Sequence, residues 1–355
     1  MADIEDTAEG DRREQAERLK AAGRELGFDV LRIAPAVSPT GYHPLLEWIA
    51  NGYAADMEWI ARRQSAYQHP DGILPNTRSV IMVAMNYRHA EPEPGTARIS
   101  RYAWGSEDYH SVLRRKLKTL AAGLNERCPE ARTRVVVDTA PLLERDFARL
   151  AGIGWFGKNT MLISRDIGSW IFLGALLTTE SLTFDEPFVG DYCGTCTRCL
   201  DTCPTGAFPA PHVLDANRCI SYLTIERRDK SVPNELRHGI GDWVFGCDIC
   251  QEVCPWNRFA PTDTIPEFRR RHELQYLDVV DLLSLDDAAF QCRFGGTPLE
   301  RTGRNVIVRN AAIVAANQHR TDTLAILNEL RNDSSELVAE AARWAVKELT
   351  QSQRR

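Results

Sequence analysis

The chain has 355 residues, of which 43% are hydrophobic and 26% charged, and its formal net charge is −6. This length predicts two or three domains of ordinary globular composition. No apolar stretch reaches the ~18–20 residues of a membrane span, and the acidic, polar residues 1–12 fit neither a secretory nor an organellar leader. We therefore expect a cytoplasmic protein without a membrane partner. The acidic total argues against a uniformly basic nucleic-acid binder but leaves room for a local basic patch.

The first half of the chain predicts helices mixed with strands. Amphipathic spacing and short apolar stretches indicate helices over residues 12–26, 45–51, 57–63, 110–127 and 142–151. Apolar runs between polar residues indicate strands over 27–33, 78–87, 134–138, 161–164 and 170–179. The run over 78–87 is apolar almost throughout, which is typical of a strand buried on both faces. We therefore predict a mixed α and β domain over residues 1–185.

Eight of the ten cysteines form one pattern, in which the first run is a C-x2-C-x2-C-x3-C-P sequence and the second is a variant of it. This is the bacterial ferredoxin run, in which the last cysteine of each run ligates the other cluster. The pattern predicts one [4Fe–4S] cluster on Cys193, Cys196, Cys199 and Cys254. It predicts the other on Cys203, Cys219, Cys247 and Cys250.

Zinc sites and disulfides are the alternatives for these cysteines. Zinc needs only four ligands, which usually come as paired C-x2-C units, and disulfides are rare in a chain without a secretory signal. Both fit the spacing less well than clusters do. We therefore predict a ferredoxin-type domain over residues 186–265. Two clusters in a row carry single electrons, so a group at one end of this domain must accept them.

Beyond residue 266 the chain predicts helices to its end, over 305–318, 321–331 and 335–349. The segments 308–312 and 338–345 are similar and lie about thirty residues apart, as in two HEAT-like repeats. A plain helical bundle that caps the core explains the same pattern, and both interpretations stay open.

Several residues of the first domain are candidates for a cofactor site. Gly152-x-Gly154-x2-Gly157 follows a helix rather than a strand, which is the wrong context for dinucleotide binding. The loop continues with Lys158 and Asn159, which suit either a polar cofactor against the main chain or a tight structural turn. The aromatic and polar segment 100–110 either lines a pocket for a flat ring or forms a surface loop.

Asp138 ends a predicted strand, at the edge where α/β sheets build their sites. Partial burial there is expected to raise the pKa of Asp138 and make it a proton donor. The alternative is a cap for the helix that follows.

These motifs together resemble the epoxyqueuosine reductase family. The resemblance rests on the cysteine runs and on the segments 100–110, 136–139, 151–160, 219–224 and 245–257. It implies reduction of epoxyqueuosine to queuosine at the wobble position of tRNA, the last step of queuosine biosynthesis, with electrons passing through two [4Fe–4S] clusters to cobalamin. It further implies an α+β protein with a nitroreductase-like cobalamin domain over 1–185, a ferredoxin-like domain over 186–265 and a HEAT-like domain over 266–355 that helps to hold tRNA.

The resemblance also implies roles for single residues. Asp138 is the expected proton donor, and the expected cofactor contacts are Ser100, Asp138, Lys158, Asn159, Ser164 and Ser169. Asp108-Tyr109-His110 begins the motif by which many proteins give cobalamin a histidine ligand, but Leu113 stands where that motif has glycine. We therefore expect cobalamin to bind base-off. We also expect a monomer that receives electrons from a low-potential donor.

A tRNA substrate requires a positively charged footprint. The candidates are Arg269, Arg270, Arg271, Arg301, Arg304 and Arg309, each of which can equally belong to a solvated charged face. Two other functions compete with this one. Another cobalamin-dependent iron–sulfur reductase, such as a reductive dehalogenase, commonly carries an export signal, and a ferredoxin-type electron carrier needs no domain ahead of its clusters.

Overall fold

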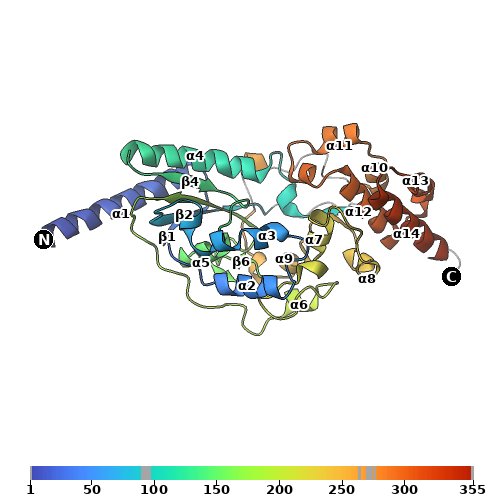
Figure 1. Ribbon diagram of the computed structural model, residues 1–355, viewed down its shortest axis with the longest axis horizontal. Helices are drawn as coiled ribbons and strands as arrows, with labels where there is room; N and C mark the ends of the chain where they lie inside the picture. Colours follow the sequence, from blue (N-terminus) through green and yellow to red (C-terminus); the bar gives the residue numbers. More distant parts are fainter. Residues whose placement is uncertain (1, 89–96, 263–264, 269–273, 275–276, 353–355) are drawn as a thin grey trace.

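The computed structural model describes residues 2–88, 97–262, 265–268, 274 and 277–352. The mixed α and β part lies at one end, the C-terminal helices lie at the other, and the cysteine region lies between them (Figure 1). No helix of the described residues is long and apolar enough to cross a membrane.

The main sheet of the described residues has the strand order β1-β2-β7-β4. Its strands are β1 (Val30–Pro35), β2 (Ser79–Asn86), β7 (Ile171–Thr178) and β4 (Thr133–Val136). All neighbouring strands run antiparallel. The expectation of an α/β-type strand edge at Asp138 is therefore wrong, because that rule applies to parallel strands.

Strand β2 is buried along its whole length. Its Ile81, Val83 and Met85 pack with helices α1 (Ala2–Glu25) and α4 (Tyr109–Arg127) on one face of the sheet. The alternate residues Val80, Met82 and Ala84 pack with α5 (Glu144–Leu150) on the other face. The structure thus confirms the strand predicted from the apolar run, with helices covering both faces.

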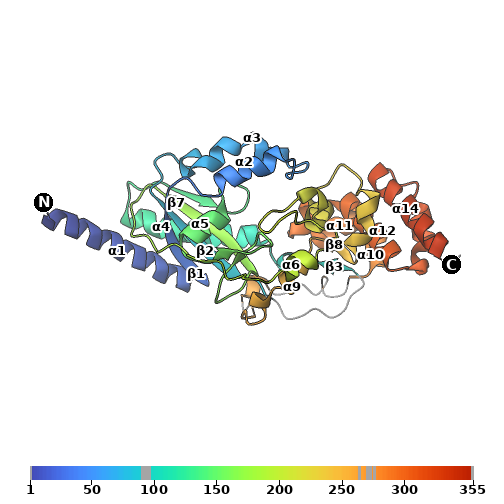
Figure 2. The same cartoon turned by 90° about the horizontal axis from the view of Figure 1, so that it is seen from below.

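Short elements complete this part of the chain. Helices α2 (Tyr42–Ala50) and α3 (Glu58–Arg62) follow β1, beside one face of the sheet (Figure 2). Strands β5 (Trp155–Phe156) and β6 (Leu162–Ile163) form an antiparallel hairpin around the predicted glycine loop. Gly154 is required there, since a Cβ would lie 2.1 Å from the carbonyl oxygen of Ile163. Packing of the hairpin therefore explains one of the spaced glycines.

The cysteine region holds short elements between its loops. They are α6 (Arg198–Asp201), α7 (Ile220–Ile225), α8 (Asn234–Arg237), β8 (Trp243–Phe245) and α9 (Ile249–Glu252). Strand β8 pairs in parallel with β3 (Arg98–Ile99), so the segment after β2 is built into this region. Short 3₁₀ helices occur at Gln64–Gln68, Pro70–Gly72, Arg101–Ala103, Ala216–Arg218, His238–Ile240, Pro255–Asn257, Pro266–Phe268, Pro298–Arg301 and Thr321–Thr323.

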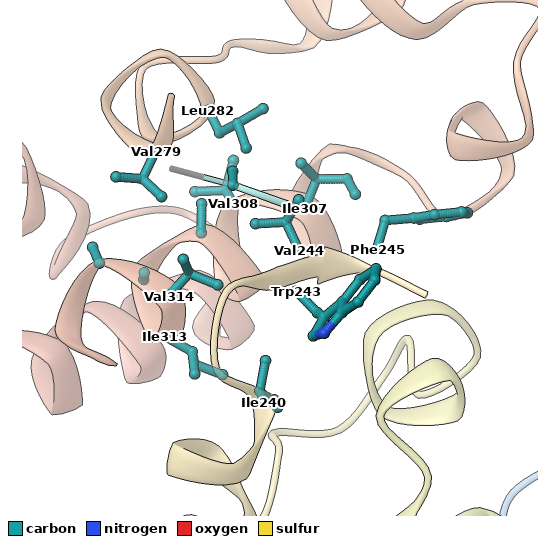
Figure 3. Close-up of a cluster of buried hydrophobic side chains, with 14 of the residues drawn as sticks. Ile240, Trp243, Val244, Phe245, Val279, Leu282, Ile307, Val308, Ile313 and Val314 are labelled. Atoms are coloured by element: carbon teal, nitrogen blue, oxygen red, sulfur yellow. The ribbon is translucent and has the colours of Figure 1, made fainter. Parts of the chain in front are cut away.

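The C-terminal part consists of α10 (Val279–Leu283), α11 (Asp287–Phe294), α12 (Arg304–Asn317), α13 (Leu324–Leu330) and α14 (Glu336–Ser352). The helix α12 is central and buried, and its apolar side chains meet those of β8 and α10 (Figure 3). The cysteine region and the C-terminal helices therefore share one hydrophobic core. The two similar segments of the sequence lie in α12 and α14, which pack together.

Candidate active site and cysteine centres

The four cysteines of the first predicted group line one cavity of about 250 Å³. Cys193, Cys196 and Cys199 come from the loop before and the first residues of α6, while Cys254 follows α9. The long connection between the two runs thus folds back to bring the last cysteine to the first three. Burial, together with the nearby Cys254 and Cys193, raises the pKa of Cys199 to about 11.

The cysteines of the second predicted group also lie together. Burial raises the pKa of Cys247, and Cys219 and Cys203 are close enough to raise it as well. Burial likewise raises the pKa of Cys250, with Cys247 and Cys219 among its charged neighbours. All eight thiols are free of disulfides. Thiols crowded together in two partly buried groups fit the ligand sets of two iron–sulfur centres.

Lys158 and Asn159 contact the cysteine loops. Lys158 Nζ donates to the carbonyl oxygens of Gly194 (2.7 Å) and Cys196 (3.1 Å). Asn159, which is buried, donates through Nδ2 to the carbonyl oxygen of Cys250 (3.2 Å). The glycine loop therefore joins the loops of both cysteine groups.

The three predicted serines are buried and bind protein groups. Ser100 Oγ donates to Asp248, which lies between two cysteines of the second group, and Asp248 also accepts from the backbone N–H of Arg101. Ser169 Oγ accepts from Asn257 Nδ2 at 2.9 Å. Ser164 Oγ accepts from the backbone N–H of Asp166. Among the predicted cofactor contacts, Asp138 and Ser169 line one pocket, while Lys158 and Asn159 line the cavity of the first cysteine group.

That pocket has a volume of about 140 Å³ and opens to solvent beside the start of β7. Its wall is apolar, from Met161, Leu162, Ile171, Phe172 and Leu173, and its polar groups are Tyr109, Asp138, Glu144, Arg145 and Ser169. The segment 100–110 contributes Tyr109, whose ring stacks on Phe172 at a centroid distance of 4.2 Å.

Asp138 lies two residues beyond β4, in a loop and not in the strand as predicted. Its φ is +58°, a left-handed conformation that aspartate tolerates better than most residues. Glu144 Oε1 accepts the backbone N–H of Asp138 at 2.8 Å and thus fixes this conformation. The side chain of Asp138 does not cap α5, where Leu143 is the N-cap residue. It is 59% exposed and lines the pocket.

His110 links Asp138 to a second carboxylate. Its Nε2 lies 3.0 Å from Asp138 Oδ2, and its Nδ1 lies 2.7 Å from Asp108 Oδ1. The ring is buried, and the guanidinium of Arg301 lies 3.1 Å from Nδ1 and 3.4 Å from Asp108 Oδ2. Tyr109 Oη donates to the same Asp138 oxygen at 3.1 Å.

This network sets the charges of the site. The hydrogen bond from His110 lowers the pKa of Asp138 and outweighs burial. Burial acts to lower the pKa of His110, but the hydrogen bonds to Asp108 and Asp138 outweigh it and raise that pKa. The expectation that the pKa of Asp138 is raised is therefore wrong, since it did not count the imidazole. The proton of this pair therefore belongs to His110 rather than to Asp138.

Glu144 behaves in the opposite way. Burial, followed by the charge of Asp138, raises its pKa to about 8. A carboxyl group that is neutral at pH 7 thus lies beside an ionised one, an arrangement that separates the roles of paired acids in enzymes. Sequence reasoning missed Glu144, and it used His110 only to exclude a cobalt ligand.

The predicted arginines have different environments. Arg309 is completely buried and donates to the carbonyl oxygens of Leu223 and Lys230, so its prediction as a phosphate contact is wrong. Arg304 is paired with Asp333 at 2.9 Å, whereas Arg301 is 45% exposed beside His110. Arg269, Arg270 and Arg271 lie outside the described residues.

Other exposed arginines surround Asp138. Arg63 donates to the carbonyl oxygen of Thr139 at 3.2 Å, and Arg114 donates to the hydroxyl of the same residue at 3.0 Å. Arg145 lines the pocket itself. Together with Arg301, which lies beside His110, these cations near the acidic site are called here the arginine ring.

These features define an iron–sulfur protein whose double cluster site adjoins an acid–base pocket. Residues 192–257 match the family described as "4Fe-4S double cluster binding domain", and residues 68–139 match the family described as "Epoxyqueuosine reductase QueG, DUF1730". The curated relatives include the epoxyqueuosine reductase of Xanthomonas campestris pv. campestris, which is 40% identical over 348 residues, 96% of this chain and 97% of that protein. The enzyme of Escherichia coli K12 is 37% identical, with 93% of this chain and 88% of that protein covered. The chain belongs to the epoxyqueuosine reductase family.

Solved structures agree with this assignment. One is a crystal structure of epoxyqueuosine reductase with an epoxyqueuosine-modified tRNA-Tyr stem loop, at 32% identity and a TM-score of 0.88, covering 94% of this chain and 89% of that one. Another, from Bacillus subtilis, has its catalytic aspartate loop swung out of the active site, at 31% identity and a TM-score of 0.85 over 94% and 90% of the two chains.

Proposed function

We propose that this protein reduces the epoxide of epoxyqueuosine in tRNA to give queuosine. The reaction consumes two electrons and two protons and releases one water. The near-complete overlap with epoxyqueuosine reductases carries this conclusion, and the acid–base pocket beside two groups of four cysteines supports it. Electrons from a low-potential donor enter through the cysteine region, because one-electron transfer is the chemistry that [4Fe–4S] clusters supply when bound.

The cluster ligands of this proposal are the two groups of cysteines as predicted. Cys193, Cys196, Cys199 and Cys254 hold the first cluster, and Cys203, Cys219, Cys247 and Cys250 hold the second. The single cavity lined by the first four cysteines supports this division. The proposed functional regions are residues 1–185 for catalysis, 186–265 for the clusters and 266–355 for a HEAT-like contact with tRNA.

Cobalamin is the proposed second cofactor, held base-off by a nitroreductase-like region. The apolar wall of Leu162, Ile171 and Phe172 fits part of one face of a corrin, and the polar side chains at the rim fit its amide edge. Asp138 and Ser169 are the predicted contacts that line this pocket, and Ser100, Lys158, Asn159 and Ser164 remain predictions. When bound, cobalamin supplies a strongly reducing nucleophile.

The residues of the chain supply the protons. His110 holds the proton and passes it through the 3.0 Å contact to Asp138, while Asp108 holds the other ring nitrogen in place. Asp138, which lines the pocket, delivers that proton to the epoxide oxygen as the carbon–oxygen bond breaks. Glu144 fixes the Asp138 loop and, being neutral near pH 7, adds no second negative charge. General acid catalysis of this kind typically contributes ~10²–10⁴-fold.

The arginine ring is the proposed contact for the anticodon stem loop. A nucleotide must leave the loop to reach a pocket of this size, as in other enzymes that act on bases. Positive charge around the entrance then binds the flanking phosphates. Arg301 brings the C-terminal region to the same entrance, which supports a role for that region in holding tRNA.

Anaerobic turnover tests the proposed function. The full chain is reconstituted with iron, sulfide and cobalamin, and is given a chemical reductant and a stem loop that carries epoxyqueuosine. Loss of one oxygen atom from the modified base, measured by mass spectrometry, is the expected result. An unchanged base with fully loaded protein contradicts the proposal.

A further inference from the structure

Trp155 carries a buried polar group that the protein fold does not use. The side chain is only 1% exposed. Its indole N–H has no hydrogen-bond partner among the described residues. Buried N–H groups in folded proteins are paired with few exceptions, so this donor indicates an acceptor that the polypeptide does not supply.

The indole is held rigidly beside the first group of cysteines. The hairpin β5–β6 fixes its backbone opposite Ile163. Its ring packs against Phe188, Tyr192 and Trp256 at centroid distances of 5.5, 5.2 and 4.8 Å. We call these four rings the aromatic box.

The box faces cysteine sulfur. Trp155 packs in one cluster with Cys254 and Cys193. The indole of Trp155 thus lies against two predicted ligands of the first cluster, and its N–H forms no hydrogen bond with the described residues.

A second tryptophan of the aromatic box, Trp256, serves as a comparison for Trp155. Trp256 touches the ring of Trp155 and lines the cavity of the first cysteine group, but its indole N–H donates to the carbonyl oxygen of Tyr192 at 3.2 Å. The two indoles therefore pack together, and of the two only Trp155 has a free donor among the described residues.

We propose that the indole N–H of Trp155 donates a hydrogen bond to a sulfur of the first cluster, at or beside Cys193, and raises the reduction potential of that cluster. The inference rests on the proposed cluster ligands. Reduction adds one negative charge to the cluster, and a donor to its sulfur stabilises the reduced form more than the oxidised form. The first cluster thereby becomes easier to reduce than it would be without this donor.

The test is a redox titration, followed by electron paramagnetic resonance, of the reconstituted full chain and its variants Trp155→Phe and Trp256→Phe. Trp155→Phe is expected to lower the potential of one cluster, by up to about a tenfold change in its reduction equilibrium, or 59 mV for one electron. Trp256→Phe is expected to leave both potentials close to those of the wild type. Equal shifts in both variants, or no shift in either, overturn the proposal.

A second measurement does not depend on the folding of Trp155→Phe. Wild type and Trp256→Phe are labelled with ¹⁵N at the indole nitrogen, and hyperfine spectroscopy of the reduced protein is expected to detect one coupled ¹⁵N in both. Absence of the coupling overturns the role of Trp155. Iron analysis separates this failure from that of the ligand assignment, because the assignment requires roughly eight irons per chain.

Discussion

His110 Nε2 lies 3.0 Å from Asp138 Oδ2, so the exposed carboxylate of the pocket is hydrogen-bonded to a buried imidazole. The imidazole is held from its other side by Asp108. A carboxylate alone at this exposed position would titrate near its ordinary value. The pair instead keeps the carboxylate ionised and the imidazole charged, with the proton one hydrogen bond away from the pocket.

Asp138→Asn is expected to lower turnover by ~10²–10⁴-fold, because the amide cannot pass a proton to the epoxide oxygen. Iron content, cobalamin retention and tRNA affinity are expected to stay unchanged. Single-turnover rates with loaded protein measure the effect. The exposed Asp229→Asn serves as the control, and a rate of Asp138→Asn equal to that of the control removes Asp138 from its role.

The pH dependence should follow His110. Its raised pKa means that the charged imidazole persists above its ordinary value of 6.5. Turnover is therefore expected to fall as pH rises through this raised pKa. His110→Gln should lower turnover and abolish this fall in turnover with rising pH. His319→Gln, at an exposed site, should keep the fall.

The same pair links pH to stability. The raised pKa of His110 contributes stability that is complete below pH 6.5 and is lost as pH rises through the folded value. The lowered pKa of Asp138 contributes stability that is present above its ordinary value of 3.8 and is lost as pH falls through the folded value. The denaturant midpoints of wild type and His110→Gln should therefore differ most between pH 3.8 and pH 6.5.

Glu144 gives a prediction at higher pH. Its pKa of about 8 keeps it neutral at pH 7, and its ionisation above that value places a second negative charge beside Asp138. Glu144→Gln keeps the acceptor for the Asp138 N–H and stays neutral, so turnover at pH 7 should change little and the decline above pH 8 should weaken. Glu144→Ala removes the acceptor and should lower turnover at every pH. Equal behaviour of the two variants contradicts this interpretation.

The sequence predicted most elements of the fold because their apolar patterns are strong. The observed ends of strand β2 and of helices α4 and α14 lie within about three residues of the predicted ends. The cysteine spacing predicted two groups of four thiols, and the first group lines one cavity, although its last member, Cys254, comes from the distant second run. Sheet direction could not be predicted this way, because an apolar run buried on both faces occurs in parallel and antiparallel sheets alike.

Charges were harder to predict, because they depend on contacts between distant segments. Arg309 looked like a surface cation, yet its partners are carbonyl oxygens of residues 223–230, more than seventy positions earlier. The pKa of Asp138 depends on His110, which comes from another element. Strand β6 lies within the predicted strand 161–164, whereas β5 was hidden in a glycine-rich segment, whose spacing fits a turn equally well.

The arginine ring predicts how tRNA binding responds to salt. Each phosphate contact that is lost should reduce the slope of log affinity against log salt by about 1. Arg114→Ala and Arg301→Ala are each expected to weaken stem-loop binding and flatten this slope. Arg18→Ala, on the exposed surface of α1, should leave both unchanged. Slopes equal to that of the wild type contradict a phosphate contact.

Cys254→Ser tests the exchange of ligands between the two cysteine runs. If Cys254 completes the first group, its loss should remove the cluster of Cys193, Cys196 and Cys199 and leave the second cluster intact. The reconstituted variant should then keep roughly four of eight irons. Cys128→Ser, which lies outside both groups, should keep all of them.

The cluster that survives in the Cys254→Ser variant shows whether the two runs exchange their last ligand. If each run instead held its own cluster, Cys254→Ser would disturb the centre of Cys247 and Cys250 and leave the cluster of the first run intact. Combining Cys254→Ser with Trp155→Phe distinguishes the two cases. The potential of the remaining cluster should not respond to Trp155→Phe under the exchanged arrangement, because the cluster beside the aromatic box is already gone.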